Sequence, residues 1–181
     1  MMPATLLLID VQAGLDDPAL GQRNKSEAEY NIARLLENWR RRNWPIVHVQ
    51  HDSTEPQSKL RPGSPGNFIK QEAKPLEDEI IFGKSVNSAF IGTGLEQYLK
   101  EHSVEKLVVV GLTTDHCVST SVRMAENLGF YVTLVADATA TFERFGYNGV
   151  HYSAEDIHQV NLLSLQNEFC RIKTTAELPG N

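Results

Sequence analysis

The chain has 181 residues, of which 41% are hydrophobic and 22% are charged, and this is the size and composition of one globular domain spanning residues 1–181. Its 17 basic and 23 acidic side chains give a formal net charge of −6, which argues against nucleic acid or an anionic membrane as a partner. The two cysteines, Cys117 and Cys170, show no CxxC spacing, so we expect neither a disulfide framework nor a cysteine zinc site. The first apolar run is too short for a signal peptide or a membrane span, and no basic segment precedes it, so we expect a cytoplasmic protein.

Strand-like and helix-like patterns alternate along the chain. Short apolar runs predict six strands, at 5–9, 45–49, 80–82, 104–111, 130–136 and 168–172. Apolar residues at helical spacing over 28–39 predict a helix with Ser26 and Glu29 as its capping box, and a last helix is expected to begin after Ser153. Such alternation is typical of a parallel sheet covered on both faces. We therefore predict a three-layer α/β/α fold with a central, mostly parallel six-stranded sheet of the Rossmann-like kind.

Three of these strands are followed by a residue that can carry chemistry. Asp10 directly follows the first strand, Lys84 follows the third after Gly83, and Cys117 begins a helical pattern six residues after Gly111. If the first three strands run outward on one side and the strand at 104–111 starts the other half, the sheet has a topological switch point between its first and fourth strands. Sites in open α/β sheets lie in the crevice at such a point. We expect Asp10, Lys84 and Cys117 to meet there.

These three residue types supply complementary roles in acyl transfer. A carboxylate can take a proton from the thiol and return it, an ammonium can stabilise both groups, and a thiolate can attack an acyl carbon. The start of a helix also favours a thiolate and can lower a thiol pKa from about 8.5 to roughly 3.5–7.5. Each residue also has an ordinary structural explanation: a buried cysteine, an acid that caps a turn and a surface lysine. Their common placement favours covalent catalysis.

Four segments carry a resemblance to a known family. They are DVQ at 10–12, GKSVNSAFIGTGL at 83–95, GLTTDHCVSTSVRMAENLGF at 111–130 and DATATF at 137–142. Together they resemble the isochorismatase-like cysteine hydrolases, the superfamily that includes nicotinamidases. The resemblance implies that Asp10, Lys84 and Cys117 form the catalytic triad. It also implies a cis peptide bond between residues 112 and 113, and an oxyanion hole made by the N–H groups of Thr113 and Cys117.

A metal site is the main difference expected within that superfamily. Nicotinamidases bind a metal just after the second strand through an Asp and several His, and here that region reads His48, Val49, Gln50, His51, Asp52. The two histidines are three residues apart on a strand, so their side chains point to opposite faces and are poor co-ligands. We therefore expect no metal and no cofactor. This difference from the metal-binding pattern of nicotinamidases argues against a true nicotinamidase.

The leading hypothesis is a hydrolase that cleaves the C–N bond of a small amide or carbamoyl compound through an acyl-enzyme on Cys117. One alternative is isochorismatase-type vinyl ether hydrolysis with Asp10 as the acid, which needs no thiol. Another is a non-enzymatic or redox-sensing thiol protein, which would need a resolving thiol near Cys117. Arg144 could hold a substrate carboxylate or face solvent. The residues expected to bind the substrate are Gln12, Gln50, His51, Asn87, Phe90, His116, Phe142 and Arg144.

Two irregular segments complete the prediction. The segment 52–74 is long and rich in Pro and Gly, and it either covers the pocket or forms a surface insertion. The segment 142–152 concentrates four aromatic residues: Phe142, Phe145, Tyr147 and Tyr152. Together with the resemblance, this aromatic area predicts a homo-oligomer, a dimer or tetramer, although internal packing of the segment is the rival explanation.

Overall fold

The structure, a computed structural model, describes residues 3–179 and contains a central sheet of six strands. Each pair of neighbouring strands is parallel, and the strand order is β3-β2-β1-β4-β5-β8. The six strands are β1 (Thr5–Ile9), β2 (Ile46–His51), β3 (Ile80–Lys84), β4 (Lys106–Leu112), β5 (Tyr131–Ala140) and β8 (Arg171–Lys173). The predicted three-layer fold around a parallel six-stranded sheet is confirmed.

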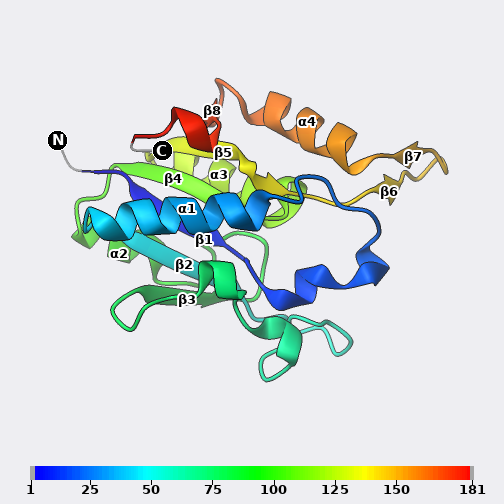
Figure 1. Ribbon diagram of the computed structural model, residues 1–181, viewed down its shortest axis with the longest axis horizontal. Helices are drawn as coiled ribbons and strands as arrows, with labels where there is room; N and C mark the ends of the chain where they lie inside the picture. Colours follow the sequence, from blue (N-terminus) through cyan, green and yellow to red (C-terminus); the bar gives the residue numbers. More distant parts are fainter. Residues whose placement is uncertain (1–2, 180–181) are drawn as a thin grey trace.

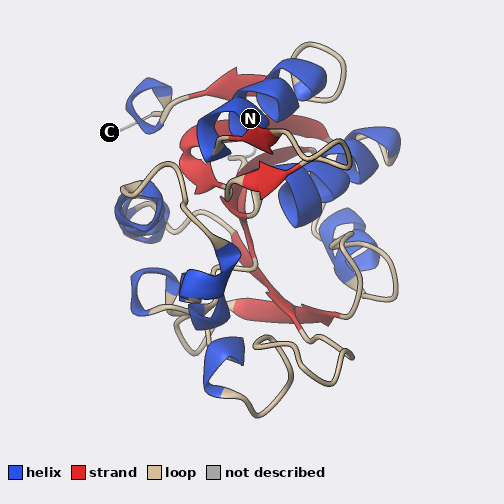
Figure 2. Cartoon of the chain, turned by 90° about the vertical axis from the view of Figure 1, so that its right-hand side faces the viewer, coloured by secondary structure: helices blue, strands red, loops and turns tan. Residues whose placement is uncertain are grey.

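Helices cover both faces of this sheet (Figures 1 and 2). They are α1 (Ala28–Arg41), α2 (Leu95–Glu101), α3 (Ser119–Asn127) and α4 (Ala154–Leu165). Alternate residues of each strand point to opposite faces, so Leu6 and Leu8 pack with α1 while Leu7 and Ile9 pack with α2 and α3. Two apolar cores result, one on each side of the sheet. The central strands β1 and β4 are buried on both faces, which explains why they appear in the sequence as continuous apolar runs, whereas the edge strands β3 and β8 are partly exposed.

The chain runs outward from β1 through β2 to β3, then crosses back so that β4 lies on the other side of β1. The switch point therefore lies between β1 and β4, as the sequence predicts. Gly111 allows close contact there, because it pairs with Ile9 at a φ of +123° and a Cβ atom would lie 2.0 Å from the Ile9 carbonyl oxygen. A side chain at this position would push the two strands apart.

The ends of several elements differ from the sequence prediction. Ser153 caps α4 as predicted, since its hydroxyl accepts a hydrogen bond from the Asp156 N–H at 3.1 Å. The predicted capping box of α1 is wrong, because the helix begins at Ala28 and the Glu29 carboxylate instead pairs with Arg23 and Lys70. These cations satisfy the carboxylate more strongly than a backbone N–H would.

Two irregular segments extend beyond the carboxyl ends of the strands. A short antiparallel hairpin of β6 (Arg144–Phe145) and β7 (His151–Tyr152) projects from the body at the right of Figure 1. The segment after β2 contains two short 3₁₀ turns, Pro65–Asn67 and Gln71–Ala73, and lies below the hairpin in the same view. In the part of the chain that the structure describes, no helix is long and apolar enough to cross a membrane.

Candidate active site

Asp10 and Lys84 form a buried ion pair where their strands end. Asp10 follows β1 with a φ of +51°, in the left-handed region that Asp tolerates better than most residues, and its N–H donates to the Val49 carbonyl at 2.9 Å. Lys84 is the last residue of β3, and its ammonium donates to Asp10 Oδ2 at 2.6 Å. The Lys84 side chain has no exposed surface, and 2% of the Asp10 side chain is exposed. The structure thus joins two charges that lie 74 residues apart in the chain.

Cys117 reaches the same point from the other side of the switch. The peptide bond between Leu112 and Thr113 is cis, and a π-helical turn over Thr114–Val118 leads into α3. Within this turn the Thr113 carbonyl accepts from the N–H groups of His116 and Val118, both at 3.2 Å. The half-buried Cys117 sulfur accepts a hydrogen bond from Lys84 Nζ at 3.3 Å. The structure therefore brings together all three residues that the sequence placed in the triad.

Side chains from other elements hold the turn that carries Cys117. The hydroxyl of Thr114 lies 2.8 Å from Nδ1 of His158, a fully buried residue of α4. On the other side of the turn, the Asp115 carboxylate accepts hydrogen bonds from the Thr141 hydroxyl and the Arg144 guanidinium. Sequence reasoning missed His158 and Thr141, because a histidine inside a helix and a threonine just after a strand give no local signal of such contacts.

Burial controls the acidity of the site. It raises the pKa of the Asp10 carboxyl above its ordinary value, although the Lys84 charge opposes the shift. Burial, helped by the Asp10 charge and opposed by Lys84, raises the pKa of the Cys117 thiol to about 12. The expected lowering of this pKa is therefore wrong, because loss of water and a neighbouring carboxylate outweigh the lysine. In the resting site the thiol is neutral.

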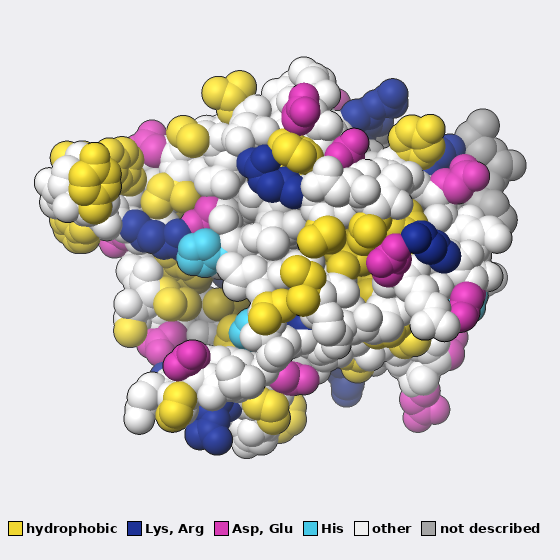
Figure 3. Space-filling view, turned by 180° about the vertical axis from the view of Figure 1, so that it is seen from behind, with side chains coloured by type: hydrophobic (Ala, Val, Ile, Leu, Met, Phe, Trp, Pro, Cys, Tyr) yellow, Lys and Arg dark blue, Asp and Glu magenta, His cyan; other side chains and the backbone are white. Residues whose placement is uncertain are grey.

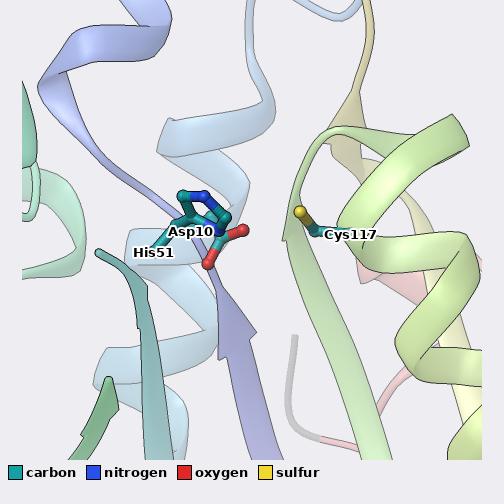
Figure 4. A group of neighbouring side chains, drawn as sticks. All are labelled: Asp10, His51 and Cys117. Carbon is teal, nitrogen blue, oxygen red and sulfur yellow. The ribbon is translucent and has the colours of Figure 1, made fainter. Parts of the chain in front are cut away.

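One oxygen of Asp10 is positioned for a proton. Among the described residues, Oδ1 of Asp10 is buried and has no hydrogen-bond partner, while Oδ2 is bound to Lys84. Figure 4 shows the carboxylate between His51 and Cys117, with one oxygen directed toward the thiol. An unpaired buried acceptor costs free energy in the resting protein. Accepting the thiol proton would satisfy it.

Three residues of the site are also possible metal ligands. One possible ligand atom from each of Asp10, His51 and Cys117 lies within 4.8 Å of the other two. However, Lys84 Nζ lies 2.6 Å from Asp10 Oδ2, 2.9 Å from His51 Nδ1 and 3.3 Å from Cys117 Sγ. The ammonium occupies the centre of the group and would repel a metal cation there. These residues do not fit a metal centre.

Two predicted substrate-binding residues instead belong to the scaffold under the site. Gln12 is fully buried; its amide nitrogen donates to the His51 carbonyl at 3.0 Å, and its oxygen accepts from the His51 N–H at 2.8 Å. Gln50 donates to the carbonyl and the side-chain oxygen of Asn67, at 3.0 and 2.9 Å. Asn67 in turn donates to the His51 carbonyl at 3.0 Å. Both glutamines therefore hold β2 and the following segment in place, and no sequence pattern predicts the role of Asn67.

Phe90 and Phe142 were also expected to bind the substrate. Phe90 is instead buried and stacks on Phe130 with ring centroids 6.1 Å apart, inside the core between the sheet and α3. Phe142 is buried as well, and its backbone bridges to Arg23. Apolar packing explains both rings, because an aromatic side chain gains more from full burial than from a wet cleft.

The remaining candidates lie at or near the surface. His51 is half-buried beside the triad, with its Nδ1 2.9 Å from Lys84 Nζ. His116 is exposed, and its Nε2 lies 3.0 Å from the Arg144 guanidinium. The carboxylate that Arg144 holds is the protein's own Asp115, which removes the need for a substrate carboxylate there. Asn87 is exposed in the segment that follows β3.

The molecular surface is indented on the side of the carboxyl ends of the strands. Figure 3 shows a notch in the molecular outline between the projecting hairpin and the segment that follows β2. Both bounding segments follow carboxyl ends of strands, so the notch lies on the same side of the sheet as the triad. The 52–74 segment borders this opening, and its Asn67 side chain donates a hydrogen bond to the carbonyl of His51 in the site.

Comparisons with known proteins agree on one family. The profile of the isochorismatase domain matches residues 4–177. The chain is 45% identical over 173 residues to the uncharacterized isochorismatase family protein YrdC of Bacillus subtilis, covering 96% of this chain and 92% of that protein. A crystal structure of an isochorismatase-family protein from Chromobacterium violaceum superposes with a TM-score of 0.93 at 45% identity, covering 96% of this chain and 90% of that one.

More distant relatives carry names of reactions. Nicotinamidase 3 of Arabidopsis thaliana is 27% identical, with 98% of this chain and 90% of that protein covered. Streptothricin hydrolase of Streptomyces noursei is 30% identical, with 76% of this chain and 50% of that enzyme covered.

Proposed function

The chain belongs to the isochorismatase family of hydrolases, and from this premise we propose that it cleaves the C–N bond of a small amide or carbamoyl compound through an acyl-enzyme on Cys117. The observation that carries the proposal is the geometry around Lys84, whose ammonium contacts the carboxylate of Asp10 and the sulfur of Cys117. The names nicotinamidase and streptothricin hydrolase among the relatives support the substrate class.

The first chemical step moves a proton and forms a bond. As Cys117 Sγ attacks the acyl carbon, its proton passes to Oδ1 of Asp10, the buried oxygen that has no partner among the described residues. The carbonyl oxygen becomes an oxyanion, for which the N–H groups of Thr113 and Cys117 are the donors we assign. On proton transfer the negative charge moves from the Asp10 carboxylate to the sulfur, and it stays beside Lys84 because the ammonium contacts both groups. A thiol with a pKa of about 12 can therefore react without a stable thiolate in the resting enzyme.

The second half of the reaction reverses these roles. Protonated Asp10 gives its proton to the departing nitrogen as the C–N bond breaks, which leaves a thioester on Cys117 and frees an amine or ammonia. A water molecule then attacks the thioester while Asp10 accepts its proton, and the thiol is regenerated as the acid product leaves. One carboxylate thus serves in turn as base and acid, and the site returns to its starting protonation state.

Two alternatives remain distinct from this reaction. Vinyl ether hydrolysis would use Asp10 as the acid and would leave the thiol without a role. A redox thiol pair would need a second cysteine close to Cys117, but Cys170 directly precedes β8 and lines a groove with residues at the amino ends of β4 and β5. Cysteines at opposite ends of a sheet cannot approach to the roughly 7 Å Cα separation that a disulfide allows. The position of Cys170 therefore favours hydrolysis over redox sensing.

An ammonia-release screen of small amides, ureas and lactams tests the proposal, with intact-mass spectrometry to detect the acyl-enzyme. Cys117→Ala is expected to abolish turnover and the mass adduct, and Cys170→Ala is the matched control that should retain both. If Cys117→Ala keeps near-wild-type hydrolysis while Asp10→Asn is inactive, the vinyl ether alternative replaces this proposal. A chelator is expected to leave the activity unchanged, because Lys84 occupies the centre of the cluster; loss with chelator and recovery with zinc or iron would contradict this.

A further inference from the structure

Lys84 uses all three of its N–H donors inside the protein. A lysine ammonium has three hydrogens and no acceptor. Its contacts here are Asp10 Oδ2 at 2.6 Å, His51 Nδ1 at 2.9 Å and Cys117 Sγ at 3.3 Å. These three acceptors take the three hydrogens, so Lys84 has none left for a substrate. Any side-chain donor facing the substrate must come from another residue.

The contact with Lys84 determines the protonation of the His51 ring. Because the ammonium can only donate, Nδ1 of His51 must accept, and the single hydrogen of the neutral imidazole then lies on Nε2. Burial and the Lys84 charge lower the pKa of His51, against the opposing charges of Asp10 and Asp52, so the ring is neutral near pH 7. Of the three forms of the ring, which are the Nδ1–H tautomer, the Nε2–H tautomer and the imidazolium cation, the contact and the charges therefore select the Nε2–H tautomer.

The ring is also held in position. The backbone of His51 exchanges two hydrogen bonds with Gln12, at 2.8 and 3.0 Å, and its carbonyl accepts a third from Asn67 at 3.0 Å. The side chain is half-buried, and Nε2 has no hydrogen-bond partner among residues 3–179. Figure 4 places His51 and Cys117 on either side of the Asp10 carboxylate. One ring nitrogen of His51 lies within 4.8 Å of the Cys117 sulfur, so the unpartnered Nε2–H belongs to a ring beside the position that a substrate on Cys117 would occupy.

We propose that His51, held as the neutral Nε2–H tautomer by Lys84, is a specificity-determining residue that donates a hydrogen bond to the substrate. The inference rests on the proposed function and deepens it. The substrate class is a small amide or carbamoyl compound with a second hydrogen-bond acceptor, such as a carbonyl oxygen or ring nitrogen, within a few bonds of the scissile carbonyl. A substrate that presents a cation or an N–H at that position leaves two donors facing each other and is rejected.

The tautomer is tested without any substrate. ¹⁵N NMR of the imidazole nitrogens in the free enzyme at pH 7, assigned by the signals lost in His51→Asn, is expected to show a protonated Nε2 and an unprotonated Nδ1. An Nδ1–H tautomer or an imidazolium would overturn the inference. This outcome is independent of whether the enzyme hydrolyses amides, so it separates failure of the inference from failure of the proposed function.

Two variants separate the roles of the two ring nitrogens. In His51→Asn the side-chain oxygen can still accept from Lys84, but no donor remains at the Nε2 position. In His51→Gln the amide N–H can reach that position, but the acceptor at Nδ1 is lost. The probes are nicotinamide, picolinamide and isonicotinamide against benzamide, which has a C–H in place of the ring nitrogen. Binding is measured by NMR titration of Cys117→Ala protein, and turnover by ammonia release.

At least one pyridine isomer is expected to have a kcat/KM roughly tenfold above that of benzamide and to shift the Nε2 signal. His51→Asn should remove this preference, so that the difference in KM and kcat/KM between that isomer and benzamide disappears, whereas His51→Gln should keep the difference. Equal use of benzamide and every pyridine isomer by the wild type, or a preference that survives His51→Asn, would overturn the inference. If no amide is turned over and Cys117 forms no adduct, the proposed function fails, and the NMR experiment still decides the tautomer.

Discussion

The two cysteines offer a comparison between the two ends of the sheet. Burial raises the pKa of both thiols to about 12. At the carboxyl end, Cys117 contacts Lys84 and faces the Asp10 carboxylate. At the amino end, Cys170 lines a groove of about 810 Å³, its sulfur lies 3.8 Å from the Leu165 carbonyl, and the charge that acts on its pKa is that of Arg123. The pKa of the thiol therefore does not distinguish the two cysteines. What distinguishes Cys117 is a carboxylate that can accept its proton and the Lys84 ammonium, which contacts both groups.

The largest effect is expected from removing the proton acceptor. Asp10→Asn keeps the shape of the side chain but cannot take the thiol proton, so kcat should fall by about 10²- to 10⁴-fold. Glu126→Gln, which changes an acid lining the groove beside Cys170, is the control and should leave kcat unchanged. Steady-state kinetics on the substrate found in the screen measures both. Near-wild-type kcat in Asp10→Asn would show that Cys117 does not need Asp10 as a proton acceptor, and would contradict the prediction.

Removing the shared cation should destabilise the fold. Lys84→Met leaves the Asp10 carboxylate buried without its partner, which is expected to cost about 3–5 kcal/mol of unfolding free energy. Lys106→Met, at the start of β4 beside the Cys170 groove, should change it by less than about 0.5 kcal/mol. Urea unfolding monitored by circular dichroism gives both values.

The loss of unfolding free energy in Lys84→Met should depend on pH in a definite direction. The folded protein already raises the pKa of Asp10, so protonated Asp10 favours the folded state at low pH, and this contribution is lost as the pH rises through the folded pKa. Without Lys84 the pKa rises further, so Lys84→Met should be less destabilised in acid than at neutral pH. A loss that is constant with pH would show that the two charges are not coupled.

Alkylation of the two thiols provides a smaller and more specific test. With a pKa of about 12, Cys117 should react with iodoacetamide at a rate that keeps rising from about pH 7 to about pH 9, faster than the more buried Cys170. Asp10→Asn removes a charge that raises the thiol pKa, so it should speed alkylation of Cys117, about tenfold for each unit of pKa, while hydrolysis falls. Peptide mass spectrometry follows both sites. A rate that levels off near neutrality would indicate a preformed thiolate.

The smallest effect on activity is expected from self-association, which stays a prediction. Of the four aromatic residues behind it, Phe142 is buried, whereas Phe145, Tyr147 and Tyr152 are exposed on the hairpin. We predict a dimer or tetramer in sedimentation at micromolar concentration, weakened by Tyr147→Ser but unaffected by Tyr131→Ser, a matched exposed tyrosine at the amino end of the sheet. Sedimentation of the wild type only as a monomer would contradict the prediction.

Sequence reasoning succeeded where a local pattern is tied to a general rule of the fold. Apolar runs without alternation predicted strands buried on both faces, and β1 has the predicted bounds. Parallel strands present their carboxyl ends at one edge, so residues at or just after the ends of β1, β3 and β4 could be expected to meet. It did not anticipate the burial of Phe90 and Phe142, because a residue near a site in the sequence can still point into the core.

The sequence by itself therefore determined the layers of the sheet, the position of the switch point and the convergence of Asp10, Lys84 and Cys117, since all of these follow from periodicity and chain direction. Only the tertiary structure decided the acidity of Cys117 and the partners of Lys84, Gln12 and His51. A pKa depends on how much water the whole fold removes, and a hydrogen bond depends on distances between segments remote in the chain. Neither quantity is encoded in the spacing of residues along one strand or helix.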